Sequence, residues 1–412
     1  MINTISISGF KSLKSIVNLE LPRFAVLFGP NTAGKSNFLD ALQALSRIGT
    51  SRTLADALQD PIRGYPIETF GFPPGGLPEL LTKDSAEFTL EASLSVGKDQ
   101  YQYKISVGIV PATGAVHVRN EYLAALTAKG TIKGSPLIEK VDSELRIRRR
   151  SKPAHPRTEP VELNHSLLSD LRLGGAEYGG IEKCRGELLG WRMYYLDPRV
   201  AMRRAAPPSE VHDIGLLGEN IAPYLYRLQK EEKRHFDAVR RLLRTLIPSV
   251  EQLDVDLDKR RGTLDITIQQ DGIAYSSRII SEGTLRILAL CAIAVNPHPA
   301  PVMAFEEPEN GVQPRRLELI AEFLTSLALK RDCQLIVTTH SPLFCATMIK
   351  KSRSNQGQIG LFQVRRGRAG TEIKPFDVAG PLFQDAAIAQ ALADRGEEAV
   401  FEGLALRGML DE

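Results

Sequence analysis

The chain has 412 residues, of which 43% are hydrophobic and 25% charged, and its formal net charge is +3. This composition is typical of a globular protein with one large domain or two to three ordinary ones, and it excludes global disorder. The small net charge gives no indication of nucleic-acid binding. No apolar run reaches the ~18 residues that span a bilayer, and the N-terminus does not have the pattern of a signal peptide, so we expect a cytoplasmic protein without a membrane segment.

The first fifty residues predict two strands followed by a strand–loop–helix unit. Residues 2–8 alternate between apolar and polar side chains, and residues 16–21 read as a second strand. The apolar run at 23–28 leads into a glycine-containing loop, after which residues 37–48 have the spacing of a helix. A strand, a glycine loop and a helix in this order form the usual frame of a phosphate-binding site.

The next part of the chain predicts an irregular connection and then an antiparallel sheet. Residues 50–83 are rich in proline and glycine. Three alternating segments follow at 87–96, 101–110 and 115–122, with turn residues between them. Short connections of this kind join antiparallel strands.

Residues 125–190 give the weakest pattern and contain a basic run at 146–150, followed by Lys152 and Arg157. Such a run favours a solvated surface segment, and a face for nucleic acid or a protein partner is the alternative. Residues 217–247 predict an amphipathic helical region whose charges form a solvated face.

The remaining segments alternate between strands and helices, as in an α/β fold. Helices are expected from Ser281 onward and over residues 313–329. No heptad array is present, so we expect no long coiled-coil arm. The four cysteines form no Cys-x-x-Cys pair and predict buried thiols in a reducing compartment. The expected strands are 191–196, 250–257, 263–270, 301–305, 334–338 and 359–365, and the cysteines are Cys184, Cys291, Cys333 and Cys345.

The loop at 29–36, GPNTAGKS, fits the pattern G-x-x-x-x-G-K-[ST]. A loop of this kind wraps a phosphate group with backbone N–H groups, and the following helix N-terminus adds a favourable partial charge. Lys35 is expected to reach the β and γ phosphates, and the Ser36 hydroxyl is expected to bind Mg²⁺. The predicted nucleotide-binding residues here are Gly29, Asn31, Thr32, Ala33, Gly34, Lys35, Ser36 and Asn37.

Two acidic residues and one histidine follow apolar strands further along the chain. The strand at 301–305 is followed by Glu306, which is expected to hold Mg²⁺ beside Ser36, and by Glu307, which is expected to act on the attacking water as a general base. The strand at 334–338 leads to His340, which is expected to stabilise the departing γ phosphate.

A fourth segment begins a helix with Ser281, Glu282 and Gly283. Ser281 is a good N-cap residue, and Gly283 permits a close approach of another backbone. By itself this segment predicts only a capped helix. Its position between the loop and the acidic strand favours a role in nucleotide binding.

These segments resemble the ABC-type ATPase heads of the SMC, RecF and OLD (overcoming lysogenization defect) group. GFKS and GPNTAGKSNFLDAL are similar to the opening strands and the Walker A loop of that group, and ISEGTLR is similar to its signature motif. VMAFEEPENGV looks like Walker B with the D-loop, and IVTTHSP looks like the switch-histidine strand. The closest likeness is to the short "AAA family ATPase" branch found in anti-phage defence systems.

The resemblance implies an α/β fold: a P-loop ABC-type ATPase head with a mixed sheet, an antiparallel β-lobe and an inserted lid. It implies ATP and Mg²⁺ as ligands and a homodimer or higher oligomer, in which Ser281, Glu282 and Gly283 of one head cap the ATP of another. The expected parts are 1–49 with the Walker A loop, 50–124 as the β-lobe and connection, 125–215 as the lid, and 216–412 with the signature, Walker B and the histidine.

The resemblance to this group says less about the biological role. The first hypothesis is an ATPase switch in anti-phage defence that controls a separate effector protein. The alternative is a RecF-like DNA repair or recombination ATPase that binds DNA. Residues 345–412 have neither the length nor the acidic cluster of the Toprim nuclease domain of OLD proteins, so we expect this tail to complete the head.

The chain also departs from the family pattern. Glu306 stands where many ABC proteins have aspartate, and Gln313 stands where relatives often have histidine. No glutamine is assigned to the Q-loop, because Gln43 falls inside the predicted helix and reads as structural.

Overall fold

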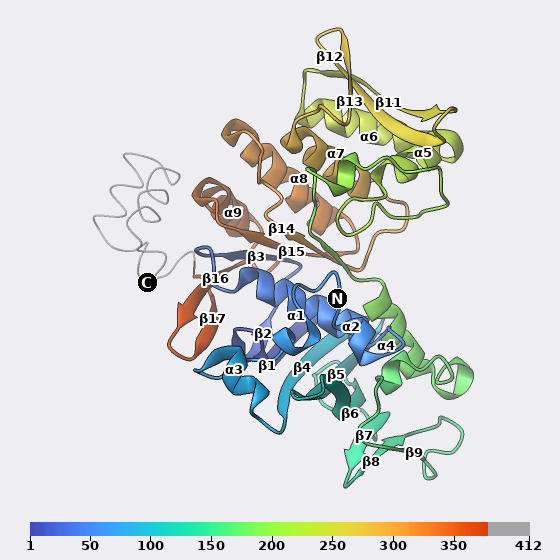
Figure 1. The fold of residues 1–412 in the computed structure, drawn as a ribbon, viewed down its shortest axis with the longest axis vertical. Coiled ribbons are helices and arrows are strands. Elements are labelled where there is room, and N and C mark those ends of the chain that lie inside the picture. Colours follow the sequence, from blue (N-terminus) through green and yellow to red (C-terminus); the bar gives the residue numbers. More distant parts are fainter. Residues whose placement is uncertain (378–412) are drawn as a thin grey trace.

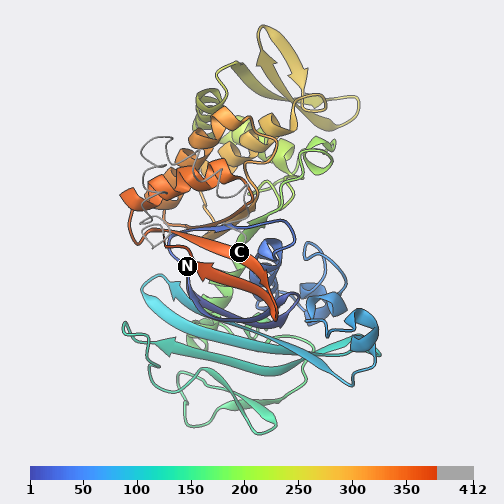
Figure 2. The same ribbon diagram turned by 90° about the vertical axis from the view of Figure 1, so that its left-hand side faces the viewer.

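A computed structural model describes residues 1–377 and shows three sheets with helices packed around them (Figure 1). Figure 2 shows the same arrangement from the side, with the large antiparallel sheet at one end of the molecule and a small three-stranded sheet at the other. A mainly parallel sheet lies between them and joins strands from distant parts of the chain. No helix in the described part of the chain is long and apolar enough to cross a membrane.

The central sheet has six strands in the order β10-β14-β15-β3-β16-β17. All neighbouring strands run parallel except β16 and β17, which form an antiparallel hairpin. Because the parallel strands end at the same edge, the residues that follow β3, β14 and β15 come close together. The strands are β3 (Phe24–Phe28), β10 (Arg192–Tyr194), β14 (Val302–Glu306), β15 (Gln334–Thr339), β16 (Ile359–Gly367) and β17 (Gly370–Pro375).

Strand β3 shows why the central sheet is covered on both faces. All five of its residues are buried, and successive side chains enter different cores. Phe24, Val26 and Phe28 pack with helices α5 to α9, whereas Ala25 and Leu27 pack with α1 and the antiparallel sheet. The helices are α1 (Lys35–Ile48), α2 (Leu54–Ala57), α3 (Gly76–Leu81), α4 (Gly179–Leu189), α5 (Ile221–Glu231), α6 (Lys233–Leu246), α7 (Glu282–Ala294), α8 (Leu317–Lys330) and α9 (Pro342–Ser354).

The large antiparallel sheet has the strand order β2-β1-β4-β5-β6-β7-β8-β9. The small sheet has the order β11-β12-β13 and covers α5 and α6. The strands of the large sheet are β1 (Ile2–Phe10), β2 (Leu13–Glu20), β4 (Ala86–Val96), β5 (Asp99–Val110), β6 (Ala115–Leu126), β7 (Ile138–Val141), β8 (Glu144–Ile147) and β9 (Arg157–Pro160), and those of the small sheet are β11 (Val250–Asp258), β12 (Thr263–Gln270) and β13 (Ile273–Ser276).

The region predicted as a lid, residues 125–215, contributes to two sheets. Strands β7, β8 and β9 extend the antiparallel sheet, α4 packs against α1, and β10 forms the edge of the central sheet beside β14. The helices here are short, and 3₁₀ turns connect them. The division of the chain at residues 124 and 215 stays a prediction.

Most predicted strands and helices are confirmed, and the mixed α/β fold class is confirmed with them. The connection at 50–83 is irregular apart from α2, α3 and a short 3₁₀ turn. The sequence pattern did not predict β13 or β17, nor β7, β8, β9 and α4 in residues 125–190. In residues 345–377 the tail supplies most of α9 together with β16 and β17, and residues 378–412 lie outside the described part of the chain.

Candidate active site

The loop after β3 has a backbone that only particular residues adopt easily. Gly29, Thr32 and Gly34 have φ angles of 153°, 69° and 109°. A Cβ atom at Gly29 would lie 2.0 Å from the carbonyl oxygen of Val364 on β16, so the loop passes directly over that strand and position 29 requires glycine. Asn31 and Thr32 are exposed at the tip of the loop, and Ala33 is buried beneath it.

Lys35 is the first residue of α1, and its ammonium group folds back into the loop. Nζ donates hydrogen bonds to the carbonyl oxygens of Gly29 at 2.7 Å and Pro30 at 2.9 Å. The residue is only 5% exposed. Burial lowers the pKa of Lys35, and the Glu307 carboxylate opposes this shift most strongly. The ammonium group is therefore held at the centre of the loop, and the acidic residues at and after the end of β14 act on it.

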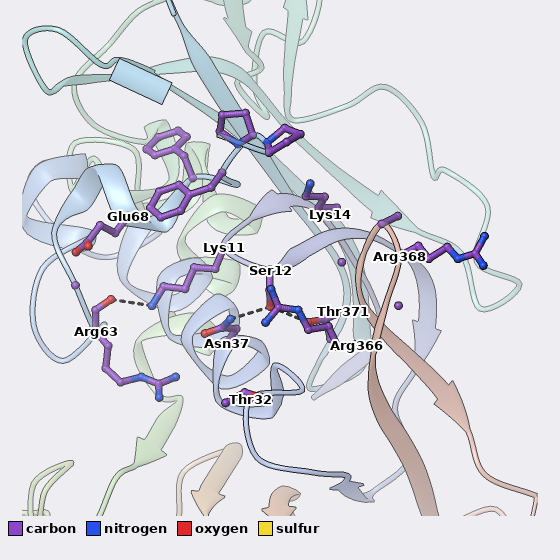
Figure 3. A pocket seen from close by; sticks show the side chains of 18 residues that line it. Lys11, Ser12, Lys14, Thr32, Asn37, Arg63, Glu68, Arg366, Arg368 and Thr371 are labelled. Carbon is purple, nitrogen blue, oxygen red and sulfur yellow. Dashed lines mark hydrogen bonds between the residues drawn. The ribbon is translucent and has the colours of Figure 1, made fainter. Parts of the chain in front are cut away.

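The outer side of the loop is held by three polar side chains from three elements. The amide of Asn37 donates to the Ser12 hydroxyl at 2.8 Å, and Ser12 shares a hydrogen bond of 2.7 Å with Thr371 of β17 (Figure 3). Thr371 donates to the carbonyl oxygen of Ala33 at 2.8 Å. A Cβ atom at Gly34 would lie 2.2 Å from the Thr371 hydroxyl oxygen. This hydrogen-bond chain fixes the loop without using its inner face.

The acidic residues lie where the strand order predicts them. Glu306 ends β14 and pairs with Thr338 of β15, whose next residue pairs with the last residue of β3. Glu307 has a left-handed φ of 45°, which turns the chain sharply, and its backbone N–H donates to the Thr338 carbonyl oxygen at 3.0 Å. Its Oε1 lies 2.8 Å from Nδ1 of His340. The structure thus places the two predicted catalytic side chains in direct contact.

The residues proposed to bind Mg²⁺ suit a hard cation that takes few protein ligands. Ser36 lies in the first turn of α1, and the Glu306 carboxylate is about one quarter exposed. Among residues 1–377 no group of three or more His, Cys, Asp or Glu residues is arranged to hold a metal. Mg²⁺ beside a nucleotide binds one or two protein oxygens, and phosphates and water complete its shell. A hydroxyl on the first turn of α1 and a carboxylate at the end of β14 fit that pattern.

The segment predicted as a signature motif does not join this cluster within one chain. Ser281 caps α7 and accepts a hydrogen bond from the backbone N–H of Thr284 at 3.2 Å, as its residue type predicts, and Glu282 forms an ion pair with Arg199. Helix α7 packs on one face of the central sheet and α1 on the other. Helix α7 therefore lies across the central sheet from α1, the helix that carries Lys35 (Figure 1).

A buried network beside the loop was not predicted from the sequence. The Asp40 carboxylate, with an exposed fraction of 0%, accepts hydrogen bonds from Lys11 at 2.7 Å, Arg63 at 2.9 Å and Tyr195 at 3.2 Å. Arg63 also approaches Glu306, with 3.9 Å between Nη1 and Oε1. Burial raises the pKa of Tyr195, so its hydroxyl stays protonated and donates. The sequence signal for this network was Asp40 itself, a charged residue on the apolar face of the helix predicted over residues 37–48.

A second missed residue is Glu309, which follows the predicted pair by two positions. Its side chain is 5% exposed and accepts a hydrogen bond from the Thr339 hydroxyl. Burial raises the pKa of Glu309 to about 7. Gln43, read from the sequence as structural, is buried inside α1.

A cavity of about 650 Å³ opens beside the loop. Lys11 and Arg63 lie on one side of it, and Arg366 and Arg368 of the β16–β17 hairpin lie on the other (Figure 3). Two phenylalanines and two prolines add apolar surface, and Glu68 is the one acidic residue in the lining. The cavity therefore combines positive charge with apolar lining next to Thr32 and Asn37 of the loop.

Comparison with known proteins gives one family match and several structural similarities. The family model described as "AAA domain, putative AbiEii toxin, Type IV TA system" matches residues 24–172 and 187–346. The chain is similar to the "Crystal structure of the SmcHead bound to the C-winged helix domain of ScpA", with a TM-score of 0.52, 15% identity, and coverage of 91% of this chain and 98% of that one. An SMC head from Pyrococcus furiosus gives a TM-score of 0.48 at 13% identity, over 95% of this chain and 99% of that one. No curated protein matches the chain.

Proposed function

The chain belongs to the AAA domain family described as "putative AbiEii toxin, Type IV TA system", and from that premise we propose that it is an ATPase that switches between separate and paired heads. The observation that carries the proposal is the convergence of the Lys35 loop, Glu306 and the Glu307–His340 contact at one edge of the central sheet. The SMC-head-like fold supports it.

In this proposal the inner face of the loop binds the triphosphate of ATP. Lys35 exchanges the carbonyl oxygens of Gly29 and Pro30 for phosphate oxygens, and the N-terminus of α1 adds a favourable partial charge. The adjacent cavity receives the nucleoside, because Asn37 links the loop to its lining. Ser36 and Glu306 would hold Mg²⁺, which would supply positive charge against the negative charge that develops during phosphoryl transfer.

Glu307 and His340 act on the attacking water. The Glu307 carboxylate accepts the proton of the water as a general base. His340, in contact with that carboxylate at 2.8 Å, holds its orientation and faces the departing phosphate. Glu307 has a left-handed backbone and contacts His340, whereas Glu306 is the last residue of β14 and approaches Arg63.

The remaining part of the site comes from a second copy of the chain. Ser281 is exposed at the start of α7, which packs on the other face of the central sheet from α1, so it is available to cap ATP held by a partner head. Gly283 lies buried behind it, against Gly311 of the same chain. Nucleotide binding then favours the paired state, and hydrolysis releases it. A lone head is expected to hydrolyse ATP slowly.

We propose that this switch controls a separate effector protein in a bacterial anti-phage defence system. The family description, which names a putative toxin of a type IV TA system, supports a two-component arrangement. The similar SMC head is, by its title, bound to a domain of another protein. Phage plating on cells that carry the gene with its genomic neighbours tests this role. Protection that persists after Lys35→Ala would contradict it.

A DNA repair or recombination ATPase is the alternative. The basic run at 146–150 motivates this alternative. Two of its arginines already have partners within the chain: Arg148 forms an ion pair with Glu139, and the Arg149 guanidinium donates a hydrogen bond to the carbonyl oxygen of His155. ATP turnover that rises with DNA, and loses this stimulation as salt increases, would favour the alternative. Turnover indifferent to DNA would favour the effector switch.

Two variants test the ATPase proposal. Lys35→Ala should abolish binding of a fluorescent ATP analogue, because the loop loses its one cation; unchanged affinity would remove the loop from the site. Glu307→Gln should bind ATP without turnover and should double its mass by light scattering only with Mg-ATP. A mass indifferent to ATP would contradict ATP-dependent pairing, and normal turnover would remove Glu307 from the catalytic role.

A further inference from the structure

Two charged side chains near the active site each have a buried polar atom without a hydrogen-bond partner among residues 1–377. These atoms are Oε2 of Glu309 and Nε of Arg286. Such atoms are uncommon in folded proteins and call for an explanation. The Glu309 carboxylate is the acidic group that acts most strongly on the Arg286 guanidinium, yet the two form no ion pair in this structure.

Glu309 is connected to the catalytic histidine through one side chain. Its other oxygen accepts a hydrogen bond from the Thr339 hydroxyl, which in turn accepts one from the backbone N–H of Ser341 at 3.0 Å. His340 lies between these two residues. The Thr339 hydroxyl therefore holds the turn that carries His340, and the position of the hydroxyl depends on Glu309.

Arg286 belongs to the helix that begins with the proposed signature residue Ser281. It lies on the first turns of α7, five residues after Ser281. The start of α7 is in contact with the segment after Walker B, because a Cβ atom at Gly283 would lie 2.3 Å from the carbonyl oxygen of Gly311. A shift of α7 against this segment changes the separation of Arg286 and Glu309.

We infer that Arg286 and Glu309 are positioning residues that couple the signature end of a head to the catalytic pair of the same head. When Ser281 engages ATP on a partner head, α7 shifts along the 307–312 segment, which it already contacts at Gly311, and Arg286 pairs with the free oxygen of Glu309. The completed pair secures Thr339 and, through it, the Glu307–His340 contact. Hydrolysis in one head then depends on whether that head is capping the ATP of its partner.

This coupling rests on the proposed ATPase function and makes ATP hydrolysis in one head depend on its contact with the partner head. In the separated head two buried polar atoms lack a partner in a region of low dielectric, and one charge-assisted hydrogen bond between Arg286 Nε and Glu309 Oε2 would satisfy both. Arg286 and Glu309 need not touch nucleotide or water for this effect. Their substitution should therefore change turnover and leave ATP affinity largely intact.

Single substitutions give the first test. Arg286→Met and Glu309→Gln should each lower kcat about tenfold, with KM and analogue binding within about twofold. The double variant should be no slower than either single variant, because the two act as one unit. Arg286→Lys should recover part of kcat, and Arg241→Met on the exposed face of α6 is the matched control. A KM effect equal to the kcat effect, or additive losses, would overturn the inference.

Mixed dimers of two differently tagged copies give the sharper test. Glu307→Gln on one copy silences that head, so only the other head turns over. With Arg286→Met on the silenced copy, turnover should match the dimer that carries Glu307→Gln alone. With Arg286→Met on the active copy, turnover should fall about tenfold. Equal losses in both arrangements, or a loss only in the first, would overturn coupling within one head.

The outcomes separate this inference from the function on which it rests. A wild-type chain that neither pairs with ATP nor turns it over refutes the ATPase proposal itself. A wild-type chain that does both, combined with mixed dimers insensitive to the placement of Arg286→Met, refutes only the coupling. Folding is checked in each variant by its melting temperature without nucleotide.

Discussion

Glu309→Gln should change the pH dependence of stability. The Glu309 carboxyl group is 5% exposed, and its pKa is raised by burial from 4.5 to about 7. Glutamine keeps an oxygen that can accept the hydrogen bond from Thr339, and it has no charge to desolvate. The substitution therefore removes the titration while it preserves the known contact.

The sign and size follow from proton linkage. Between pH 4.5 and about 7 the folded chain holds a proton on Glu309 that the unfolded chain has lost. Stability therefore falls as pH rises through this window and is level above it. At about 1.4 kcal/mol per pH unit, the full loss is about 3 kcal/mol. Relative to the wild type, Glu309→Gln should gain about that much stability between pH 4.5 and pH 7.

Urea denaturation followed by circular dichroism, from pH 4.5 to pH 8 without nucleotide and with EDTA, measures the difference. Glu318→Gln, at an exposed position of α8, is the control and should follow the wild-type curve. If the free energy of unfolding had the same pH dependence in the wild type and in Glu309→Gln, the titration of Glu309 would be refuted as its cause. A gain confined to pH values above 7.5 would also refute it, because the window would then belong to another group.

Two further substitutions should lower the stability of the site. Asp40→Ala should lower the free energy of unfolding, measured by urea denaturation, by about 2–4 kcal/mol, because it leaves the Lys11 ammonium without its carboxylate partner and next to the partly exposed Arg63. The control Asp332→Ala, at a carboxylate that is 94% exposed, should change it by under about 0.5 kcal/mol. Equal effects of the two substitutions would contradict a stabilising role of the Asp40 network. Gly283→Ala should cost about 1–3 kcal/mol, since its Cβ would meet the Gly311 carbonyl oxygen at 2.3 Å. The control is Gly186→Ala, at a position in α4 where an added Cβ atom would have open space beyond the helix's own backbone, and it should be neutral or stabilising. A Gly283→Ala variant as stable as the wild type would refute the close contact with Gly311.

The sequence by itself determined the local parts of the proposed site. A glycine loop between a buried strand and a helix, and acidic residues directly after another buried strand, are short-range patterns with few structural solutions. Ser281 was identified as a helix cap for the same local reason, and it caps α7. Lys35, Glu306 and His340 come together because β3, β14 and β15 lie in one parallel sheet and end at the same edge, and that strand order comes from the tertiary structure.

Only the tertiary structure decided which distant residues meet. Strand β10 reaches the central sheet from more than a hundred residues before its partner β14, and no local pattern specifies that pairing. Asp40 gains its partners from a turn, a loop and the residue after β10, and Glu309 gains Thr339 from the next strand along. The placement of α7 and α1 on opposite faces of one sheet is likewise a packing outcome. The physical reason is that local patterns fix backbone conformation and which face is apolar, whereas contacts between faces depend on the packing of the whole chain.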